Sequence, residues 1–297
     1  MTLPEHAALR WHEDPALFRE AVSFTAAETG FVPRLIEKDY FCTVLLEYLT
    51  TAGTELIFKG GTCLAKVHAG FYRLSEDLDF VIPTPVDASR SQRTRLAAAS
   101  KRLMGAIVGR VPFMRIVAPL AGANDSTQYS AVIGYDSLLG AREETIKIEI
   151  GLREPLLRSA PPAEARTLLL DPISGTPLVP ALLVPCLSRE ETMAEKLRAA
   201  LSRREPAIRD FYDIDHAVRR LGLRVRDPVL IELVREKLAV PGNAPIDVST
   251  ARLTALKLQI ESQLKPVLRD EDFAEFDLVR AFADVADLAT VLGRPYV

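Results

Sequence analysis

The chain has 297 residues, a formal net charge of −3 and 48% hydrophobic residues. This length can bury a full core and suggests one large domain or two smaller ones. The charge balance gives no overall basic signature for nucleic-acid binding, so contact with RNA would need a local patch. No apolar run approaches the length of a membrane span, and the polar N-terminus lacks a signal-peptide core, so we expect a soluble, cytoplasmic protein.

Three cysteines, Cys42, Cys63 and Cys186, lie far apart in the sequence and form no CxxC pair. This odd number and spacing predict isolated, buried thiols in a reducing compartment, and neither a disulfide framework nor a zinc site. The four histidines form no metal-ligand pattern either.

Two helices are predicted in the N-terminal part of the chain. Residues 15–27 follow a typical Asp-Pro helix start, and residues 33–49 repeat apolar side chains at helical spacing. The second helix carries the charged run Glu37-Lys38-Asp39-Tyr40, which we interpret as a solvated face. Lys38 is nevertheless a possible site residue.

The stretch from Leu56 to Ile82 organises the chain. It predicts a short strand at 56–58, a turn through Gly60-Gly61-Thr62 into a helix, and a second strand that carries two aspartates. Glycines let backbone approach a ligand closely, and a helix N-terminus favours anions, so this turn suits a phosphate group.

Asp77 and Asp79 lie two residues apart in the second predicted strand, so their side chains share one face. Two adjacent carboxylates repel each other unless a cation lies between them. Mg²⁺ takes hard oxygen ligands and is often bound by one or two carboxylates together with substrate phosphates. The opposite face of this strand is apolar and predicts the core contacts of Leu78, Phe80 and Ile82.

Each of these two motifs has a simpler explanation when it stands alone. Many strand-to-helix turns contain glycine, and a DxD sequence in a strand is often a solvated edge. Their order, their spacing and the apolar residues around both aspartates favour a site for a metal-bound nucleoside triphosphate.

A third carboxylate is predicted in the strand at 145–150, which reads TIKIEI. The three isoleucines face the core, so Lys147 and Glu149 share the opposite face. Glu149 can therefore join Asp77 and Asp79, although a solvated edge strand would show the same pattern. A helix at 89–108 and strands at 113–119 and 129–135 complete this part of the chain.

The composition changes near Leu187. Residues 155–185 are rich in proline, leucine and serine and predict irregular structure with a strand or two, whereas the remaining chain is almost entirely helical. We therefore predict one domain at 1–187 and a helical domain at 188–297.

The helical domain offers one cationic flank and two aspartates. A capping box at Ser188 predicts a helix on which Arg189, Lys196 and Arg203 recur every seven residues along one side. A surface lysine is the alternative for Lys196. Asp210 and Asp213 share a face of the following helix, where a first-turn aspartate is often only a cap. Further helices are predicted at 230–238, 249–264 and 273–292.

Together these stretches resemble a known family. KGGT followed by SEDLDF resembles the signature of the DNA polymerase beta-like nucleotidyltransferase superfamily. More closely, IEKDY, FKGGTCL, RLSEDLDF, KIE, AEKLRA and RDFYD, in this order between residues 33 and 215, resemble the AbiEii/MenT nucleotidyltransferase toxins. The resemblance implies an α+β fold: a nucleotidyltransferase domain with a core near 33–155, having a small mixed or antiparallel sheet flanked by helices, and then a C-terminal helical domain.

The resemblance also implies a role for individual residues. Lys196 matches a lysine that contacts the triphosphate, and Asp210 or Asp213 matches the aspartate of the last motif, with Asp210 favoured. Glu76 is not assigned to metal. The other matches are the phosphate-binding turn Gly60, Gly61 and Thr62, the metal ligands Asp77, Asp79 and Glu149, and Ser75, a serine beside the aspartate motif that we expect to bind the nucleotide. Two Mg²⁺ ions are expected at the carboxylates. Apart from these matches, we keep four possible site residues: Lys38, Lys59, Asp213 and Arg203.

Proteins of this family are bacterial toxins paired with a separately encoded antitoxin. Characterised MenT-type members transfer a nucleotide from an NTP to the 3′ acceptor end of tRNA and so block translation. Two alternatives remain open for this chain: transfer to a protein or small-molecule acceptor, and a non-catalytic nucleotidyltransferase fold that acts as a binding module.

Overall fold

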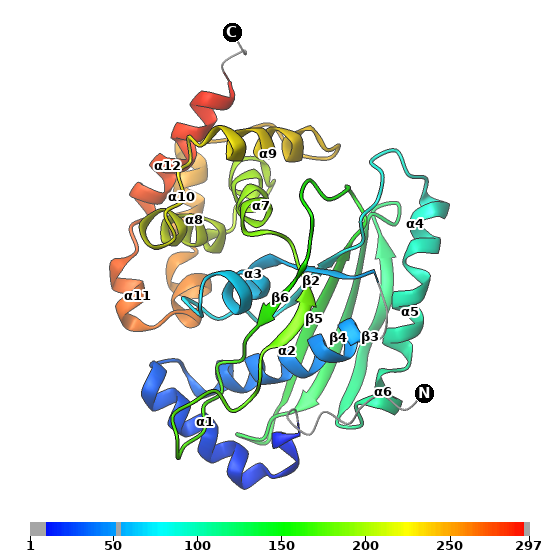
Figure 1. The fold of residues 1–297 in the computed structure, drawn as a ribbon. Helices are drawn as coiled ribbons and strands as arrows, with labels where there is room; N and C mark the ends of the chain where they lie inside the picture. Colours follow the sequence, from blue (N-terminus) through cyan, green and yellow to red (C-terminus); the bar gives the residue numbers. More distant parts are fainter. Residues whose placement is uncertain (1–9, 52–54, 294–297) are drawn as a thin grey trace. The chain divides into compact units, whose positions relative to one another are not determined.

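A computed structural model of the chain describes residues 10–51 and 55–293. These residues form two compact units, shown as a ribbon in Figure 1. The N-terminal unit runs to Pro155 and also contains Ala160–Cys186. The C-terminal unit contains Leu156–Ser159 and the chain from Leu187 onward.

A five-stranded mixed sheet forms the centre of the N-terminal unit (Figure 1). The spatial order is β1-β2-β5-β4-β3, in which β2 and β5 pair in parallel and the other neighbours pair antiparallel. The strands are β1 (Ile57–Lys59), β2 (Leu78–Val81), β3 (Met114–Ala123), β4 (Gln128–Asp136) and β5 (Glu143–Gly151). The mixed α+β architecture expected from the sequence is confirmed.

Helices cover this sheet. α2 (Pro33–Thr51) crosses one face, where Phe41 packs against Tyr135 of β4 with ring centroids 4.2 Å apart (Figure 1). α1 (Pro15–Thr29) packs on α2 and follows a single 3₁₀ turn at Trp11–Glu13.

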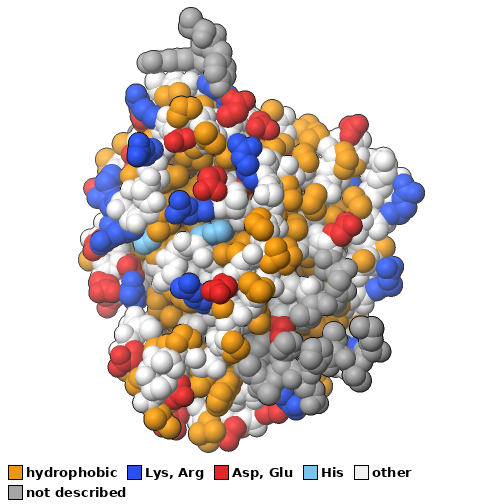
Figure 2. All heavy atoms as spheres, viewed as in Figure 1, with side chains coloured by type: hydrophobic (Ala, Val, Ile, Leu, Met, Phe, Trp, Pro, Cys, Tyr) orange, Lys and Arg blue, Asp and Glu red, His pale blue; other side chains and the backbone are white. Residues whose placement is uncertain are grey.

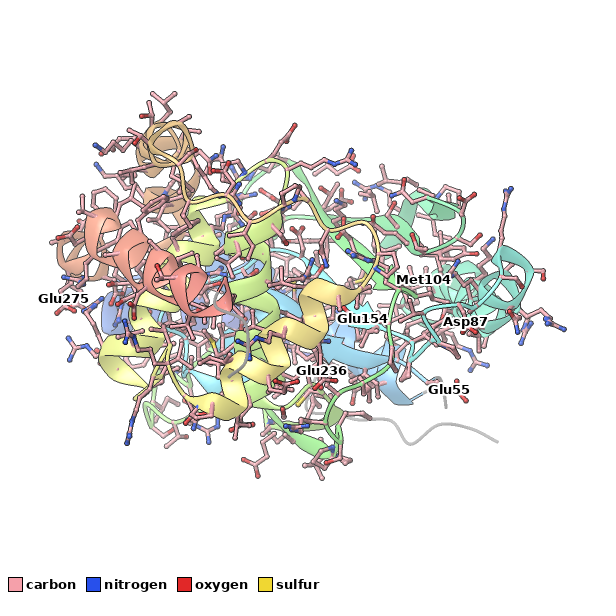
Figure 3. The ribbon with its side chains drawn as sticks, turned by 90° about the horizontal axis from the view of Figure 1, so that it is seen from above. Glu55, Asp87, Met104, Glu154, Glu236 and Glu275 are labelled. Carbon is pink, nitrogen blue, oxygen red and sulfur yellow. The ribbon has the colours of Figure 1, made fainter. Side chains whose placement is uncertain are left out.

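The helix predicted at 89–108 has a capping box at Ser89 but is broken into three helices. The breaks fall at Ala97 and Ala106, and Met104 is buried between the second helix and the sheet (Figure 3). The three helices are α4 (Arg90–Leu96), α5 (Ala98–Gly105) and α6 (Ile107–Arg110). The last two contact β3.

Two further features complete the unit. After β1, α3 (Gly60–Cys63) runs directly into a π-helical turn at Leu64–His68. A second, two-stranded antiparallel sheet pairs β6 (Pro162–Ala165) with β7 (Leu182–Pro185), and β7 contacts β1.

The prediction of a solvated face at residues 37–40 is wrong, because all four side chains are buried. Glu37 accepts hydrogen bonds from the Ser137 hydroxyl and the Leu138 amide, both at 2.7 Å. Asp39 forms an ion pair of 2.6 Å with Lys66, a lysine with no exposed side-chain surface. Specific partners on other segments satisfy these groups, and sequence periodicity cannot reveal such partners.

The C-terminal unit is helical. Its helices are α7 (Arg189–Ser202), α8 (Ile208–Arg220), α9 (Pro228–Ala239), α10 (Thr250–Lys257), α11 (Asp270–Glu275) and α12 (Leu278–Leu292), with a π-helical turn at Ile260–Leu264 and a 3₁₀ turn at Lys265–Val267. The helix predicted at 273–292 is interrupted before Asp277, which caps α12. Within the described part of the chain, no helix is long and apolar enough to cross a membrane.

The capping box predicted at Ser188 forms only in part. The Ser188 hydroxyl accepts a hydrogen bond from the Glu191 amide, as expected for an N-cap. The Glu191 carboxylate points elsewhere: it forms a buried ion pair of 2.7 Å with Lys237 and accepts hydrogen bonds from the Leu157 and Arg158 amides. Glu191 therefore ties α7 to α9 and to the short segment before β6.

Candidate active site

The turn at Gly60–Thr62 lies directly against a carboxylate. Gly60 has a φ of +78°, in the left-handed region that favours glycine. A Cβ atom at this position would lie 2.1 Å from Oδ2 of Asp79, far inside any real contact. The antiparallel pairing of β1 and β2 creates this approach, since Lys59 is the register partner of Asp79. The predicted phosphate-binding turn and the predicted metal ligand therefore share one site.

A buried arginine lies behind the same turn. A Cβ atom on Gly61 would be 2.7 Å from Nη2 of Arg73 and 3.1 Å from Oγ of Ser75. Arg73 is only 2% exposed, and its Nη1 donates to the Leu74 carbonyl at 3.1 Å. Arg73 supplies a fixed positive charge next to the predicted phosphate-binding turn, and the sequence prediction missed it. In the sequence, only the position of Arg73 within the RLSEDLDF motif could have indicated this role.

Thr62 holds the turn to the aspartate motif. Its hydroxyl donates a short hydrogen bond to the carbonyl of Asp77, and the residue is buried. The hydroxyl is therefore engaged within the protein, and only the backbone of Thr62 remains suited to the predicted contact with a nucleotide.

The three predicted carboxylates come from the two parallel strands of the sheet. Asp77 directly precedes β2, Asp79 lies within it, and both are partly exposed, whereas Leu78 and Phe80 between and after them are fully buried. Glu149 of β5 is the register partner of Asp79. Neighbouring strands are about 4.8 Å apart, so this register brings the two carboxylates to adjacent positions on one face.

Glu149 is paired with a cation of its own strand. Lys147 forms an ion pair with Glu149, and the pKa of Lys147 is raised by that hydrogen bond against the opposing effect of burial. The charges of Asp77 and Asp79 raise this pKa further. Within the described residues, the oxygens of Asp77, Asp79 and Glu149 do not all lie within 4.8 Å of one another. Glu149 would have to leave Lys147 to share a metal ion with both aspartates.

The donor set nevertheless fits Mg²⁺. Asp77, Asp79 and Glu149 offer only carboxylate oxygens, which are the hard ligands that Mg²⁺ prefers. Because Gly60 has no Cβ, only its backbone atoms border that side of the Asp79 carboxylate. Lys147 shows that this cluster already attracts a positive charge.

Glu76 and Lys38 belong to a neighbouring ion-pair network. Glu76 accepts from Lys38 Nζ at 2.7 Å and from Arg34 at 3.1 Å. Burial alone would raise the pKa of Glu76, but the hydrogen bond from Lys38 and the charges of Lys38 and Arg34 outweigh it and lower the pKa. Glu76 is thus directed to these cations, and Lys38 positions the aspartate motif through Glu76.

In the C-terminal unit, Lys196 of α7 lies between two aspartates of α8. Its Nζ is 2.9 Å from Oδ1 of Asp210 and 2.9 Å from Oδ2 of Asp213. The side chain of Lys196 is 13% exposed, so it is not the free surface lysine that periodicity alone allowed. The spacing of three residues puts both aspartates on one helix face. Arg203 is largely exposed and lies 3.6 Å from Oδ2 of Asp210.

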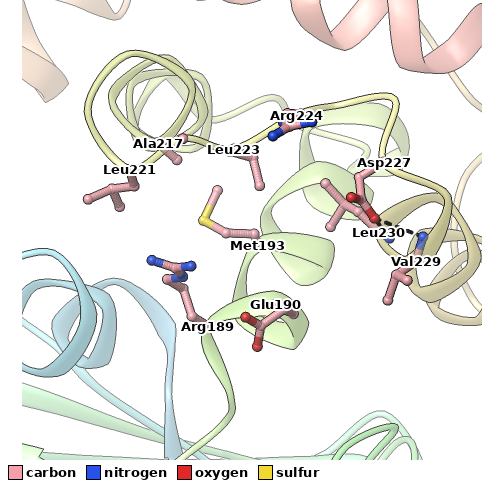
Figure 4. A pocket seen from close by; sticks show the side chains of 11 residues that line it. Arg189, Glu190, Met193, Ala217, Leu221, Leu223, Arg224, Asp227, Val229 and Leu230 are labelled. Carbon is pink, nitrogen blue, oxygen red and sulfur yellow. Dashed lines mark hydrogen bonds between the residues drawn. The ribbon is translucent and has the colours of Figure 1, made fainter.

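Arg189, the first residue of the predicted cationic flank, lines a different feature. It borders a cavity of about 460 Å³ within the C-terminal unit, together with Glu190 and Met193 of α7, residues 217 and 221–224, and residues 227, 229 and 230 (Figure 4). Asp227 on the far side of this cavity caps α9 and accepts from the Val229 amide at 2.9 Å. Arg189 and Lys196 therefore have separate surroundings.

Solved structures first define the class of fold. Two structures from Helicobacter pylori, one described as a "putative nucleotidyltransferase" and the other as JHP933, each match with a TM-score of 0.52 at 16% sequence identity. Each match covers 88% of this chain, and 96% and 93% of the respective structure. The fold is therefore nucleotidyltransferase-like. No curated protein sequence matches the chain.

The family follows from the sequence match over residues 44–287 to the model described as "Nucleotidyl transferase AbiEii toxin, Type IV TA system". The chain belongs to this family of nucleotidyltransferase toxins. Membership confirms the resemblance to this family, although the IEKDY stretch at 36–40 precedes the matched residues, and it implies an NTP substrate and an antitoxin partner.

Proposed function

We propose that this protein transfers a nucleoside monophosphate from an NTP to the 3′ end of tRNA in a Mg²⁺-dependent reaction. The close approach of Gly60 to the Asp79 carboxylate is the observation that carries the proposal. This approach supports the proposal because a predicted phosphate-binding turn beside a predicted metal ligand suits a metal-bound triphosphate. The tRNA acceptor follows from the family resemblance.

The reaction forms one phosphorus–oxygen bond and breaks another, and the proton of the acceptor hydroxyl passes to solvent. The 3′ oxygen of the acceptor attacks the α-phosphorus of the NTP, the bond from that phosphorus to the bridging oxygen breaks, and pyrophosphate leaves. Asp77, Asp79 and Glu149 would hold Mg²⁺, which would supply Lewis-acid activation of the acceptor hydroxyl and neutralisation of the leaving pyrophosphate.

The residues of the chain itself provide positioning and charge. The backbone of Gly60 and Gly61 holds the phosphates at close range, and Arg73 beside Gly61 adds a buried positive charge. Ser75 contributes a hydroxyl at the same place. The family resemblance assigns Lys196 the role of a cation that contacts the triphosphate. Asp210 and Asp213 hold its amino group in place. Fixed donors of this kind cost no reorganisation during the reaction.

Contact with tRNA requires local positive charge. On the face drawn in Figure 2, basic and acidic side chains of the described residues are interspersed, in line with the net charge of −3. Arg203, which is exposed beside Asp210, is our candidate for one backbone-phosphate contact. If Arg203 makes one such contact, Arg203→Ala reduces the slope of log binding constant against log salt concentration by about one.

The direct test incubates the protein with Mg²⁺, total tRNA and each labelled NTP in turn. Asp79→Asn removes a proposed ligand while keeping its shape. Asp87→Asn is the matched control, because Asp87 is an exposed carboxylate before α4 (Figure 3). We expect labelled tRNA with the wild type and Asp87→Asn, and none with Asp79→Asn.

Other outcomes separate the alternatives. Label on protein or on a small molecule, but not on tRNA, would contradict the proposed acceptor and keep the transferase. NTP binding with no transfer to any acceptor would instead support a non-catalytic binding module. Co-production of the cognate antitoxin tests the partner through recovery of growth in cells that make this protein.

A further inference from the structure

Three potential metal ligands converge in the N-terminal unit, apart from the carboxylate site. The sulfur atoms of Cys63 and Cys186 and a ring nitrogen of His68 all lie within 4.8 Å of one another. They are the only group of three or more His, Cys, Asp or Glu side chains with this geometry in residues 10–51 and 55–293. The prediction that all three cysteines are buried is confirmed, but Cys63 and Cys186 are not isolated.

The π-helical turn at Leu64–His68 explains how Cys63 and His68 meet. In an α-helix, residues five apart point to nearly opposite sides, because five residues correspond to about 1.4 turns. A π-helical turn is wider, with hydrogen bonds from residue i+5 to residue i, so residues five apart come back to one side. Here the Ala69 amide donates to the Leu64 carbonyl at 2.8 Å.

A long-range strand contact brings in the third ligand. Cys186 directly follows β7 and forms an isolated parallel bridge with Phe58 of β1. β1 leads through the glycine turn to Cys63, so the bridge sets the two thiols side by side. A separation of 123 residues between Cys63 and Cys186 hides this pairing from any local sequence motif.

The surroundings suit a metal ion with one open position. Cys63 has no exposed surface and Cys186 is 2% exposed, whereas His68 is partly exposed. The Cys186 side chain is hydrogen-bonded to Cys63 and to His68, so the three groups already interact. An ion would reach them along His68, and solvent could provide a fourth ligand there.

We propose that Cys63, His68 and Cys186 bind one Zn²⁺ ion. Two sulfurs and one imidazole nitrogen are ligands that zinc accepts, and three protein ligands with an open fourth position form a known type of zinc site. Tetrahedral zinc with Zn–S bonds of about 2.3 Å needs a sulfur–sulfur separation of roughly 3.8 Å. The observed limit of 4.8 Å therefore requires a closure of at most about 1 Å.

Charge and protons balance in this site. Both cysteines bind as thiolates, so two thiol protons are released to solvent and the bound unit of two thiolates, a neutral imidazole and Zn²⁺ is neutral. No oxidant is needed. The ion would link the helix that follows the phosphate-binding turn to β7. A zinc site here goes beyond the proposed transferase activity, because its ligands are separate from the carboxylates.

The test titrates the full-length, reduced protein, freed of metal, with Zn²⁺ alone and with Co²⁺ as a spectroscopic probe. Cys186→Ser removes one ligand. Cys42→Ser is the matched control, because Cys42 is equally buried but lies outside the cluster. We expect one equivalent of Zn²⁺ and a thiolate-to-cobalt charge-transfer band in the wild type and in Cys42→Ser, and loss of both in Cys186→Ser.

Two results would overturn the proposal. One is a wild-type cobalt complex without the thiolate band, which would assign any bound metal to the carboxylates; this result does not depend on whether the variants fold. The other is a reduced protein that binds no zinc but readily forms a Cys63–Cys186 disulfide on oxidation, seen by mass spectrometry. His68→Ala, expected to bind Zn²⁺ more weakly while keeping the thiolate band, distinguishes a three-ligand site from a pair of thiols.

Discussion

The α-carbon of Gly60 packs against the carboxylate of Asp79 so closely that a single methyl group between them would lie 2.1 Å from Oδ2. This contact joins the two motifs on which the proposed chemistry depends. The glycine is required there for space as well as for its φ of +78°. A change at position 60 must therefore displace Asp79, the turn, or both.

Gly60→Ala should reduce nucleotidyl transfer by at least about 100-fold, since a displacement near 1 Å at a reacting centre has effects of that size. Thermal unfolding should also show a loss of roughly 1–3 kcal/mol, typical of a strained left-handed residue. Gly70→Ala is the control: Gly70 has a φ of +66°, but a methyl group added there would meet no atom of the described residues within 4 Å. Equal activity loss in both variants would mean that strain alone, and not the collision with Asp79, is responsible.

In the proposed site, Lys147 and a metal ion would compete for Glu149. Lys147→Ala should lower the Mg²⁺ concentration for half-maximal transfer by up to about fivefold, because an exposed ion pair is worth roughly 0.2–1 kcal/mol. The same charge change at Lys101, which is exposed on α5, should leave the Mg²⁺ dependence unchanged. A higher Mg²⁺ requirement in Lys147→Ala would show that Lys147 assists the site and that Glu149 is not a ligand.

Strand alternation made much of the N-terminal unit predictable. The buried Ile146, Ile148 and Ile150 and the outward Glu149 follow directly from a period of two. Strand alternation and the family resemblance both suggested Glu149 as a third carboxylate beside Asp77 and Asp79, but the parallel register that pairs Asp79 with Glu149 is a long-range property that neither of them gave. Helix breaks such as those within residues 89–108 depend on packing, which composition does not reveal.

Buried charge was the main source of error. Asp39 looks like a surface residue in the sequence, yet it lies beside Lys66, and Lys66 also donates to the Thr43 hydroxyl at 2.7 Å. Arg73 and the Cys63–Cys186 pair were missed for the same reason, because their partners come from other segments. Polar side chains of this kind become interpretable only when the residues that satisfy them are known.

Lys196 neutralises two aspartates at once. Lys196→Met should destabilise the C-terminal unit by about 3 kcal/mol, since it leaves buried carboxylates without their cation. Lys257→Met on the exposed side of α10 should have no measurable effect on unfolding. Lys196→Arg should recover most of the stability but not the KM for NTP, because a guanidinium cannot reproduce the point charge. Recovery of both would assign Lys196 a purely structural role.

Asp210 and Asp213 should differ in their effects. The Asp213 side chain has no exposed surface, whereas that of Asp210 is 8% exposed and has Arg203 nearby. Asp213→Asn should therefore lower stability by about 2 kcal/mol, in the range of a lost hydrogen bond to a charged group. Asp210→Asn should lower the transfer rate with less effect on unfolding. The reverse pattern in denaturant melts and kinetics would make Asp213 the functional aspartate.

His216 of α8 should make the stability of the C-terminal unit depend on pH. Burial lowers its pKa to about 4, and the positive charge of Arg219 adds to this against the opposing charge of Asp213. The unfolded chain has a histidine pKa near 6.5, so between about pH 6.5 and 4 the unfolded state binds more protons than the folded state. Stability should be complete above this window and fall as the pH is lowered through it.

His216→Gln isolates this effect from the other groups that titrate in the same range. His12 of the N-terminal unit also has a pKa lowered by burial, so the wild-type profile contains more than one contribution. The difference between wild type and His216→Gln in free energy of unfolding, measured from pH 7.5 to 4.5, removes those common contributions. That difference should shrink as the pH falls, because only the wild type loses stability by protonating residue 216. A difference independent of pH would show that folding does not shift the pKa of His216, as for a solvent-exposed imidazole.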